Sequence, residues 1–165
     1  MVTREQVKEL REITGAGILD CKRALEEVKG DITSAVEVLR KRGLAKAEKK
    51  AKREVRQGLV EAYIHTGGRI GSMVEVNCET DFVAQTDDFR ELVHNLAMQV
   101  AATDPSFVGS DDLPEEVDPR QACLLHQPFI KDPGKTVGDI IIETIVKVGE
   151  NIRVSRFARF ELAKE

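Results

Sequence analysis

Aromatic residues are scarce in this sequence, which has no tryptophan, one tyrosine and six phenylalanines among 165 residues. No uninterrupted apolar run is long enough to cross a membrane, and residues 1–5 carry no apolar segment of a secretion signal. The three cysteines lie far apart without a Cys-x-x-Cys pair, which speaks against a disulfide framework or a zinc knuckle. We therefore expect a cytoplasmic protein that does not bind a membrane. A transit peptide that had been removed would leave no trace.

The composition is that of a soluble globular protein, with 41% hydrophobic and 33% charged residues. The formal net charge is −4, so the chain does not coat nucleic acid with its whole surface. Its length suffices for one ordinary domain, or for a small helical module followed by a modest second domain.

Three short helices are predicted in residues 1–43. Thr3 and Gln6 form a capping-box pattern at the start of the first helix, which should end at Gly15. A second helix should end near Gly30, and Asp31 is placed to cap a third, which we expect to stop at Gly43. The apolar residues of these helices recur at helical spacing, so residues 1–43 are predicted to form a compact module.

A basic linker is predicted at residues 44–57, within a stretch, 40–56, that holds nine Lys or Arg against two Glu. Large apolar residues are almost absent there. We favour a solvated, partly helical linker over a nucleic-acid-binding arm, because the aromatic and amide side chains that read bases are scarce beside the charges.

Residues 58–165 are predicted to form an α+β core: an antiparallel three-stranded sheet with helices on one face. Alternating apolar residues predict a hairpin of strands 58–65 and 70–78, and a final strand at 152–162. Helices should begin at Asp87 and after Thr136, and the acidic, proline-rich segment 103–119 should form a surface loop. The apolar residues expected to face the helices are Val60, Ala62, Ile64 and the even-numbered ones of the last strand, leaving Leu59, Tyr63, Met73 and Phe157 on the opposite face.

No enzyme chemistry is indicated. Gly134-Lys135-Thr136 matches the end of a phosphate-binding loop, but Phe129 stands where such a loop needs its first glycine. The three histidines are far apart and have no ligand partners at metal-binding spacing, and no nucleophile with a matched base is visible. We therefore expect no catalytic residues, no metal and no cofactor.

The stretch NCETDFVAQTDDF, residues 77–89, contains an aromatic residue outside any periodic pattern. Phe82 belongs neither to the alternation of the strand before it nor to the helical repeat after it. Two interpretations remain open: Phe82 is a satellite of the core, or it is a projecting apolar wedge, with Asp81 beside it, aimed into a pocket of a partner.

Two stretches resemble the elongation factor Ts family. LREITGAGILDCKRAL, residues 10–25, followed by GDITSAVEVLRKRG, is similar to the family's N-terminal module, a three-helix fold of the ubiquitin-associated type. EVNCETDFVA, residues 75–84, resembles the family's signature, with weaker likeness in YIHTGGRIG and QPFIKDPGKTVGD. The resemblance covers nearly the whole chain. It implies a guanine-nucleotide exchange factor for elongation factor Tu, of the short form with a single core subdomain.

The resemblance also implies contact residues. The family residue matching Phe82 inserts between helices of the elongation factor Tu GTPase domain near its magnesium and phosphate site, with Asp81 beside it and Thr80 and Val83 flanking. The module is expected to dock on another helix of that domain through Leu10, Arg11 and Thr14. His65 and Gly68 are further expected contacts, and Gln85 replaces a residue that is usually basic in the family.

A competing hypothesis is an RNA- or ribosome-binding adaptor, in which the module and the basic linker bind and the core is only a spacer. We favour the exchange factor without stable nucleic-acid binding. Longer family members have a second core subdomain against the first, so we also expect this chain to form a homodimer through its sheet region.

Overall fold

The N-terminal residues form the three helices predicted for them. In the computed structural model, which describes residues 2–111 and 113–164, these helices are α1 (Arg4–Thr14), α2 (Ile18–Glu27) and α3 (Ile32–Lys50). The capping box of Thr3 and Gln6 is present, and Gly15 ends α1 in the left-handed region with φ of 65°. Five fully buried residues form the centre of this module: Leu10, Cys21, Ala24, Leu25 and Ala35.

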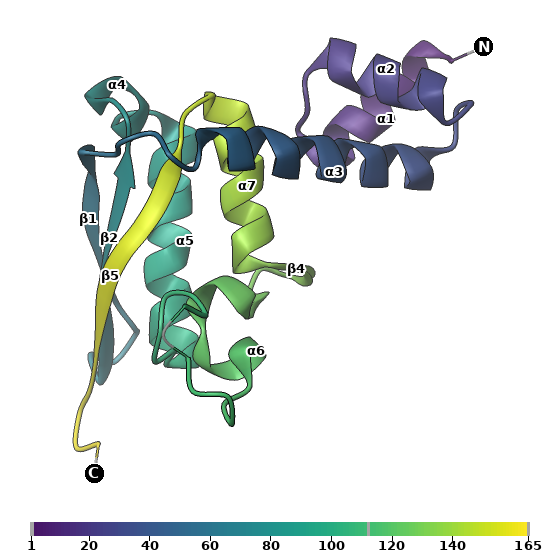
Figure 1. Ribbon diagram of the computed structural model, residues 1–165. Helices are drawn as coiled ribbons and strands as arrows, with labels where there is room; N and C mark the ends of the chain where they lie inside the picture. Colours follow the sequence, from purple (N-terminus) through teal and green to yellow (C-terminus); the bar gives the residue numbers. More distant parts are fainter. Residues whose placement is uncertain (1, 112, 165) are drawn as a thin grey trace.

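The third helix does not stop at Gly43, and that prediction is wrong. The strong helix formers Ala, Lys and Glu continue α3 to Lys50. Gly43 is buried where α3 packs against α7 (Val137–Val148), and an added Cβ would lie at ordinary contact distance, 3.4 Å from Val146 Cγ2. Figure 1 shows α3 running from α1 and α2 to α7. The division of the chain at residues 43 and 57 stays a prediction.

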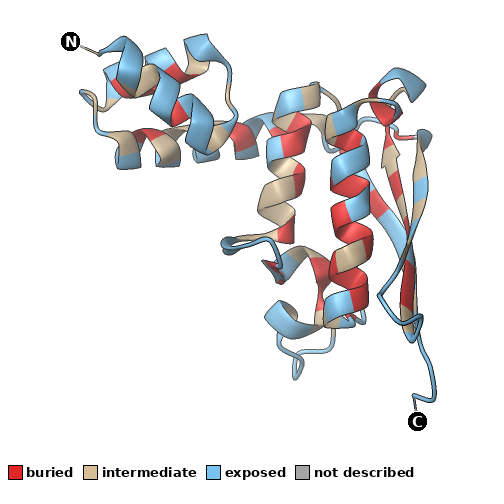
Figure 2. Cartoon of the chain, turned by 180° about the vertical axis from the view of Figure 1, so that it is seen from behind, coloured by how far each residue is buried: buried red, intermediate tan, exposed pale blue. Residues whose placement is uncertain are grey.

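The rest of the chain has the predicted α+β class. Strands β1 (Gln57–Ile64), β2 (Ile70–Cys78) and β5 (Ile152–Glu161) form an antiparallel sheet in the order β1-β2-β5. Helix α5 (Asp87–Thr103), capped by Thr86 rather than by Asp87, packs against one sheet face, and α7 packs along α5 (Figure 1). Figure 2 shows that buried residues gather where α5, α7 and the sheet face one another.

The predicted covered face of the sheet is wrong for β1 and for the second half of β5. Leu59 and Tyr63 pack against the core, whereas Val60 and Ile64 are 61% and 66% exposed. The pairing explains this, because Leu59 lies opposite the buried Val76. In β5 the register shifts after Val154, so the residues beyond the bulge change faces. Phe157 therefore packs against the core, and Phe160 and Leu162 are exposed.

The acidic segment lies on the helical side of the sheet. After α5 the described residues of 104–118 form neither helix nor strand, and Asp112 of the predicted loop lies outside the described residues. Leu124 N–H donates to Phe107 O at 2.9 Å, and Leu125 N–H donates to Val108 O at 3.0 Å. The remaining short elements are α4 (Asp81–Ala84), α6 (Pro119–Ala122), η1 (Leu124–His126), β3 (Pro128–Phe129) and β4 (Asp132–Thr136). The β3–β4 hairpin was not predicted.

Candidate functional site

Phe82 lies on a single helical turn, α4, directly after β2. Thr80 caps this turn, since its hydroxyl accepts a hydrogen bond from Val83 N–H at 3.4 Å. Val83 and Ala84 are buried and anchor the turn to the core, whereas the Phe82 side chain is 81% exposed. Asp81 beside it is also exposed. A large apolar side chain at this exposure has no core to belong to, so Phe82 projects from an anchored turn.

The exit of β2 beneath this turn is held by polar contacts. The Cys78 thiol is buried and donates to Thr80 O, with Sγ 3.1 Å from that oxygen. Burial, and then the negative charges of Glu150 and Glu79, raise the pKa of the Cys78 thiol to about 11. Glu79 accepts a hydrogen bond from Asn151 N–H at 2.7 Å and pairs with Arg53 at 3.5 Å. Residues 78–80, which connect β2 to the turn carrying Phe82, are therefore held by hydrogen bonds and an ion pair.

The three residues expected to dock the N-terminal module do not share one surface. Leu10 has no exposed area, so its side chain is a core residue. Thr14 is half-buried, and its hydroxyl donates to Leu10 O at 2.7 Å. Arg11 is exposed and lines a groove with Val7 and Ile18. Of the three, Arg11 is the one whose side chain faces outward.

Sequence reasoning missed an apolar surface on the module. Ile13 of α1 and Ile18 and Leu19 of α2 are 50%, 57% and 68% exposed. The signal was present, because a module as small as residues 1–43 cannot bury every apolar residue of its helices. These three residues flank the turn between the helices.

The two candidate contact regions lie on the same side of the molecule but far apart along it. In Figures 1 and 2, α4 and the module of α1 and α2 both lie on the side away from α6, near opposite ends of α3. His65 and Gly68 lie at the β1–β2 turn, at the other end of β2 from α4. The nine residues of β2 separate them from Phe82 by about 30 Å. The structure does not bring these residues together with Asp81 and Phe82.

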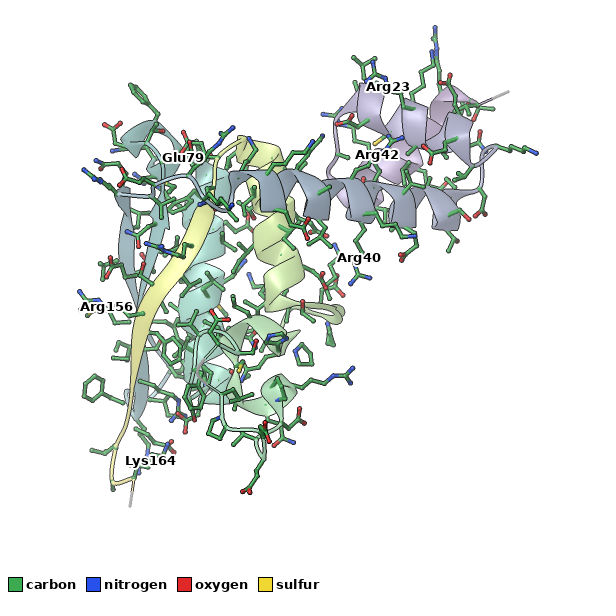
Figure 3. All side chains as sticks on the ribbon, viewed as in Figure 1. Arg23, Arg40, Arg42, Glu79, Arg156 and Lys164 are labelled. Atoms are coloured by element: carbon green, nitrogen blue, oxygen red, sulfur yellow. The ribbon has the colours of Figure 1, made fainter. Side chains whose placement is uncertain are left out.

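The basic stretch is largely engaged by the protein itself. Figure 3 shows Arg42 directed toward α2 and Arg40 toward α7. The polar contacts from this stretch are Arg42–Glu27 at 2.5 Å, Lys46–Asp20 at 3.2 Å, Arg40–Asp139 at 3.3 Å, Arg53–Glu79 at 3.5 Å and Lys50 Nζ to Gly149 O at 2.7 Å. These charges join α3 to the module and the core, which leaves fewer of them for the phosphates of a nucleic acid.

The described residues hold neither a cluster of metal-binding side chains nor a helix that could span a membrane. Nowhere in 2–111 and 113–164 do three His, Cys, Asp or Glu side chains gather as metal ligands. Over the same residues, every helix falls short of the length and apolar character that crossing a membrane requires.

Comparison with known proteins gives one consistent result. A family model described as elongation factor TS matches residues 2–122. The chain is 50% identical to elongation factor Ts of Thermotoga neapolitana, covering 99% of this chain and 98% of the relative. It is 50% identical to that of Moorella thermoacetica (99% and 97%) and 48% identical to that of Carboxydothermus hydrogenoformans (99% and 90%). The aligned spans of 194 to 196 residues exceed the 165 residues of this chain, so these relatives carry additional residues within them. The chain therefore belongs to the elongation factor Ts family of translation elongation factors.

Proposed function

We propose that this protein binds elongation factor Tu carrying GDP and accelerates GDP release by disturbing the magnesium and phosphate site. The observation that carries the proposal is the 81% exposure of Phe82 on a turn anchored by the buried Val83 and Ala84. An exposed aromatic side chain on a rigid support loses little conformational freedom on entering a pocket, so most of its burial energy goes into binding.

The chemistry of GDP retention explains how such a wedge would act. Mg²⁺ bridges the nucleotide phosphates to the GTPase, so moving the groups that hold the ion raises the rate at which GDP leaves. Asp81 would add a hydrogen-bond acceptor beside the wedge. Coupling between two ligands is reciprocal, so a factor that weakens GDP binding is itself weakened by nucleotide. Incoming nucleotide would then displace the factor after each cycle.

The N-terminal module supplies a second contact in this proposal. Arg11 and the exposed Ile18 line one groove with Val7, a mixed basic and apolar surface suited to an amphipathic helix of the GTPase domain. Leu10 and Thr14 support that surface from within. Since the module and α4 both lie on the side of the molecule away from α6, a partner with an extended surface can touch both, and the module would raise the local concentration of the wedge.

The test is the release of labelled GDP from elongation factor Tu, measured as a function of factor concentration. We expect Phe82→Ala to lower the release rate at saturation at least tenfold, with a melting temperature within a few degrees of the wild type. Arg11→Ala should raise the concentration needed for half-maximal release and leave the saturating rate unchanged. Ile130→Ala, which trims an apolar residue at the 36% exposed position between β3 and β4, is the matched control and should change neither.

The proposal fails if the wild-type chain leaves GDP release unchanged. If Phe82→Ala unfolds early but retains full activity per folded molecule, the wedge assignment alone fails. The adaptor hypothesis makes the opposite prediction, namely RNA binding that weakens steeply with salt and no effect on GDP. The internal pairing of the basic stretch favours the exchange factor.

A further inference from the structure

The carboxylate of Glu150 accepts hydrogen bonds from the residues that directly follow β2, although it lies far from them in the sequence. Glu150 lies in the turn between α7 and β5, 70 residues beyond Thr80. Its Oε2 accepts hydrogen bonds from Glu79 N–H at 3.1 Å and Thr80 N–H at 3.0 Å, and its Oε1 accepts from the Thr80 hydroxyl at 2.6 Å. All three donors come from the two residues that precede Asp81 and Phe82.

A second set of hydrogen bonds runs in the opposite direction, from the α7–β5 turn to the Glu79 side chain and the end of α3. Asn151, the next residue after Glu150, donates its backbone N–H to the Glu79 carboxylate at 2.7 Å. The Asn151 side chain is buried and donates to Arg53 O at 2.9 Å and Ala51 O at 3.4 Å. Arg53 in turn pairs with Glu79. One polar network therefore joins the end of α3, the end of β2 and the α7–β5 turn. It lies next to α4, the helical turn that carries Phe82.

The Thr80 hydroxyl links this network to the tip. A hydroxyl has one hydrogen to donate and lone pairs with which to accept. Because Thr80 donates its hydrogen to Glu150, the oxygen is left as an acceptor for Val83 N–H, which is the cap of α4. A charged acceptor makes such bonds shorter and stronger than a neutral one. Glu150 thus fixes the rotation of the hydroxyl that starts the helical turn.

From this geometry we infer that Glu150 is a positioning residue for the Asp81–Phe82 wedge, acting through Thr80. The inference that the wedge acts on elongation factor Tu rests on the proposed function, but the positioning itself is a property of the free protein. Removal of the carboxylate frees two backbone N–H groups and the hydroxyl together, so the Thr80 hydroxyl is no longer held in the rotation that caps α4, the cap weakens and the direction of Phe82 is less well fixed. Glutamine is no substitute, because its amide nitrogen, placed against Thr80, would require the hydroxyl to accept.

Two substitutions and a matched control test this. Glu150→Ala and Glu150→Gln are compared with Glu143→Gln, which removes an exposed carboxylate of α7 that pairs with Lys135 at 2.8 Å. Amide hydrogen exchange in the free protein should accelerate about tenfold or more at residues 79, 80 and 83 in Glu150→Ala, and not at Val74 or Val93 in the core. In Glu150→Gln the acceleration should be confined to residue 83, because the amide oxygen can still accept from the backbone N–H groups of Glu79 and Thr80. Glu143→Gln should leave all of these amides unchanged.

A double-mutant cycle with Thr80→Val identifies the path. If Glu150 acts through the hydroxyl, Glu150→Ala should add little at the Val83 amide once Thr80→Val is present. The Glu150 variants should also lower the saturating rate of GDP release, with a smaller effect on the half-maximal concentration. Unchanged exchange at residues 79, 80 and 83, or a parallel increase throughout the core, would overturn the positioning role. A wild-type chain that fails to release GDP would overturn the proposed function. The positioning role of Glu150 would then be decided by amide hydrogen exchange alone.

Discussion

Cys78 ends β2 with its thiol buried beside the tip that carries Phe82. Its pKa of about 11 leaves about one thiol in a thousand ionised at pH 8. Since the thiolate is the nucleophile and the sulfur is shielded from solvent, we expect iodoacetamide to leave Cys78 unmodified in the folded protein at pH 8. Peptide mass spectrometry should show modification only after unfolding in guanidinium chloride.

A positive control makes this measurement decisive. Thr66→Cys adds an exposed thiol in the β1–β2 turn and should be alkylated within minutes under the same conditions. If Cys78 in the folded Thr66→Cys protein reacted nearly as fast as the introduced thiol, the end of β2 would have to unfold locally and often. The anchored support assumed for the wedge would then be wrong.

The sequence located Phe82 because a bulky aromatic residue outside both neighbouring periodicities is conspicuous. The family resemblance assigned Leu10 a partner contact, although its spacing with Val7 and Ile13 already indicated the inward face of the helix, where the structure buries it. The role of Glu150 could not be predicted from the sequence for another reason. Its partners lie 70 residues earlier, and no local pattern marks a carboxylate that binds backbone N–H groups of a distant strand.

Gly43 shows how packing changes the meaning of a residue at the scale of an element. A glycine after a periodic stretch commonly ends a helix, yet here it lies inside α3 where α7 approaches. Its backbone is helical, and an added Cβ would lie 3.4 Å from Val146 Cγ2 and 3.7 Å from Ile142 Cγ2, at the close end of ordinary contact. We expect Gly43→Ala to raise the free energy of unfolding by about 0.5–1 kcal/mol, because alanine restricts the unfolded chain and favours helix.

Urea unfolding would measure this change. Ala45→Gly, at an exposed position of the same helix, is the matched control and should lower the free energy of unfolding by about 1 kcal/mol. A destabilised Gly43→Ala protein would show instead that α3 and α7 meet too closely for a methyl group, and that glycine is required at the crossing.

Most elements were predictable because their signals are local. The Thr3–Gln6 and Thr136–Asp139 capping boxes and the glycine turn of the hairpin depend on neighbours in sequence. The sheet faces were not predictable in the same way. Alternation shows which residues share a face but not which face is covered, and the bulge after Val154 reverses the alternation of β5.

At the scale of the whole molecule, residues 2–111 and 113–164 leave one face of the sheet uncovered. Met73 pairs with Ala62 and Ala158, and Gly71 pairs with Ile64 and Phe160, so these residues share the face opposite α5. Ile64, Met73 and Phe160 are 66%, 51% and 75% exposed. The acidic segment, which could have covered this face, lies beside Leu124 and Leu125 on the helical side. An apolar sheet face of this kind calls for a partner surface.

We propose that two copies of the chain meet through this face about a two-fold axis, which would cover it while α4 of each copy stays at the end of the sheet. Sedimentation equilibrium at micromolar concentration should then give about twice the chain mass of 18.3 kDa. Met73→Glu should return the protein to the single-chain mass, because it places a charge at the centre of the apolar face. Leu19→Glu, at an apolar position of the N-terminal module that is 68% exposed, should leave the dimer intact. A mass near 18.3 kDa for the unaltered chain at every concentration would contradict the dimer.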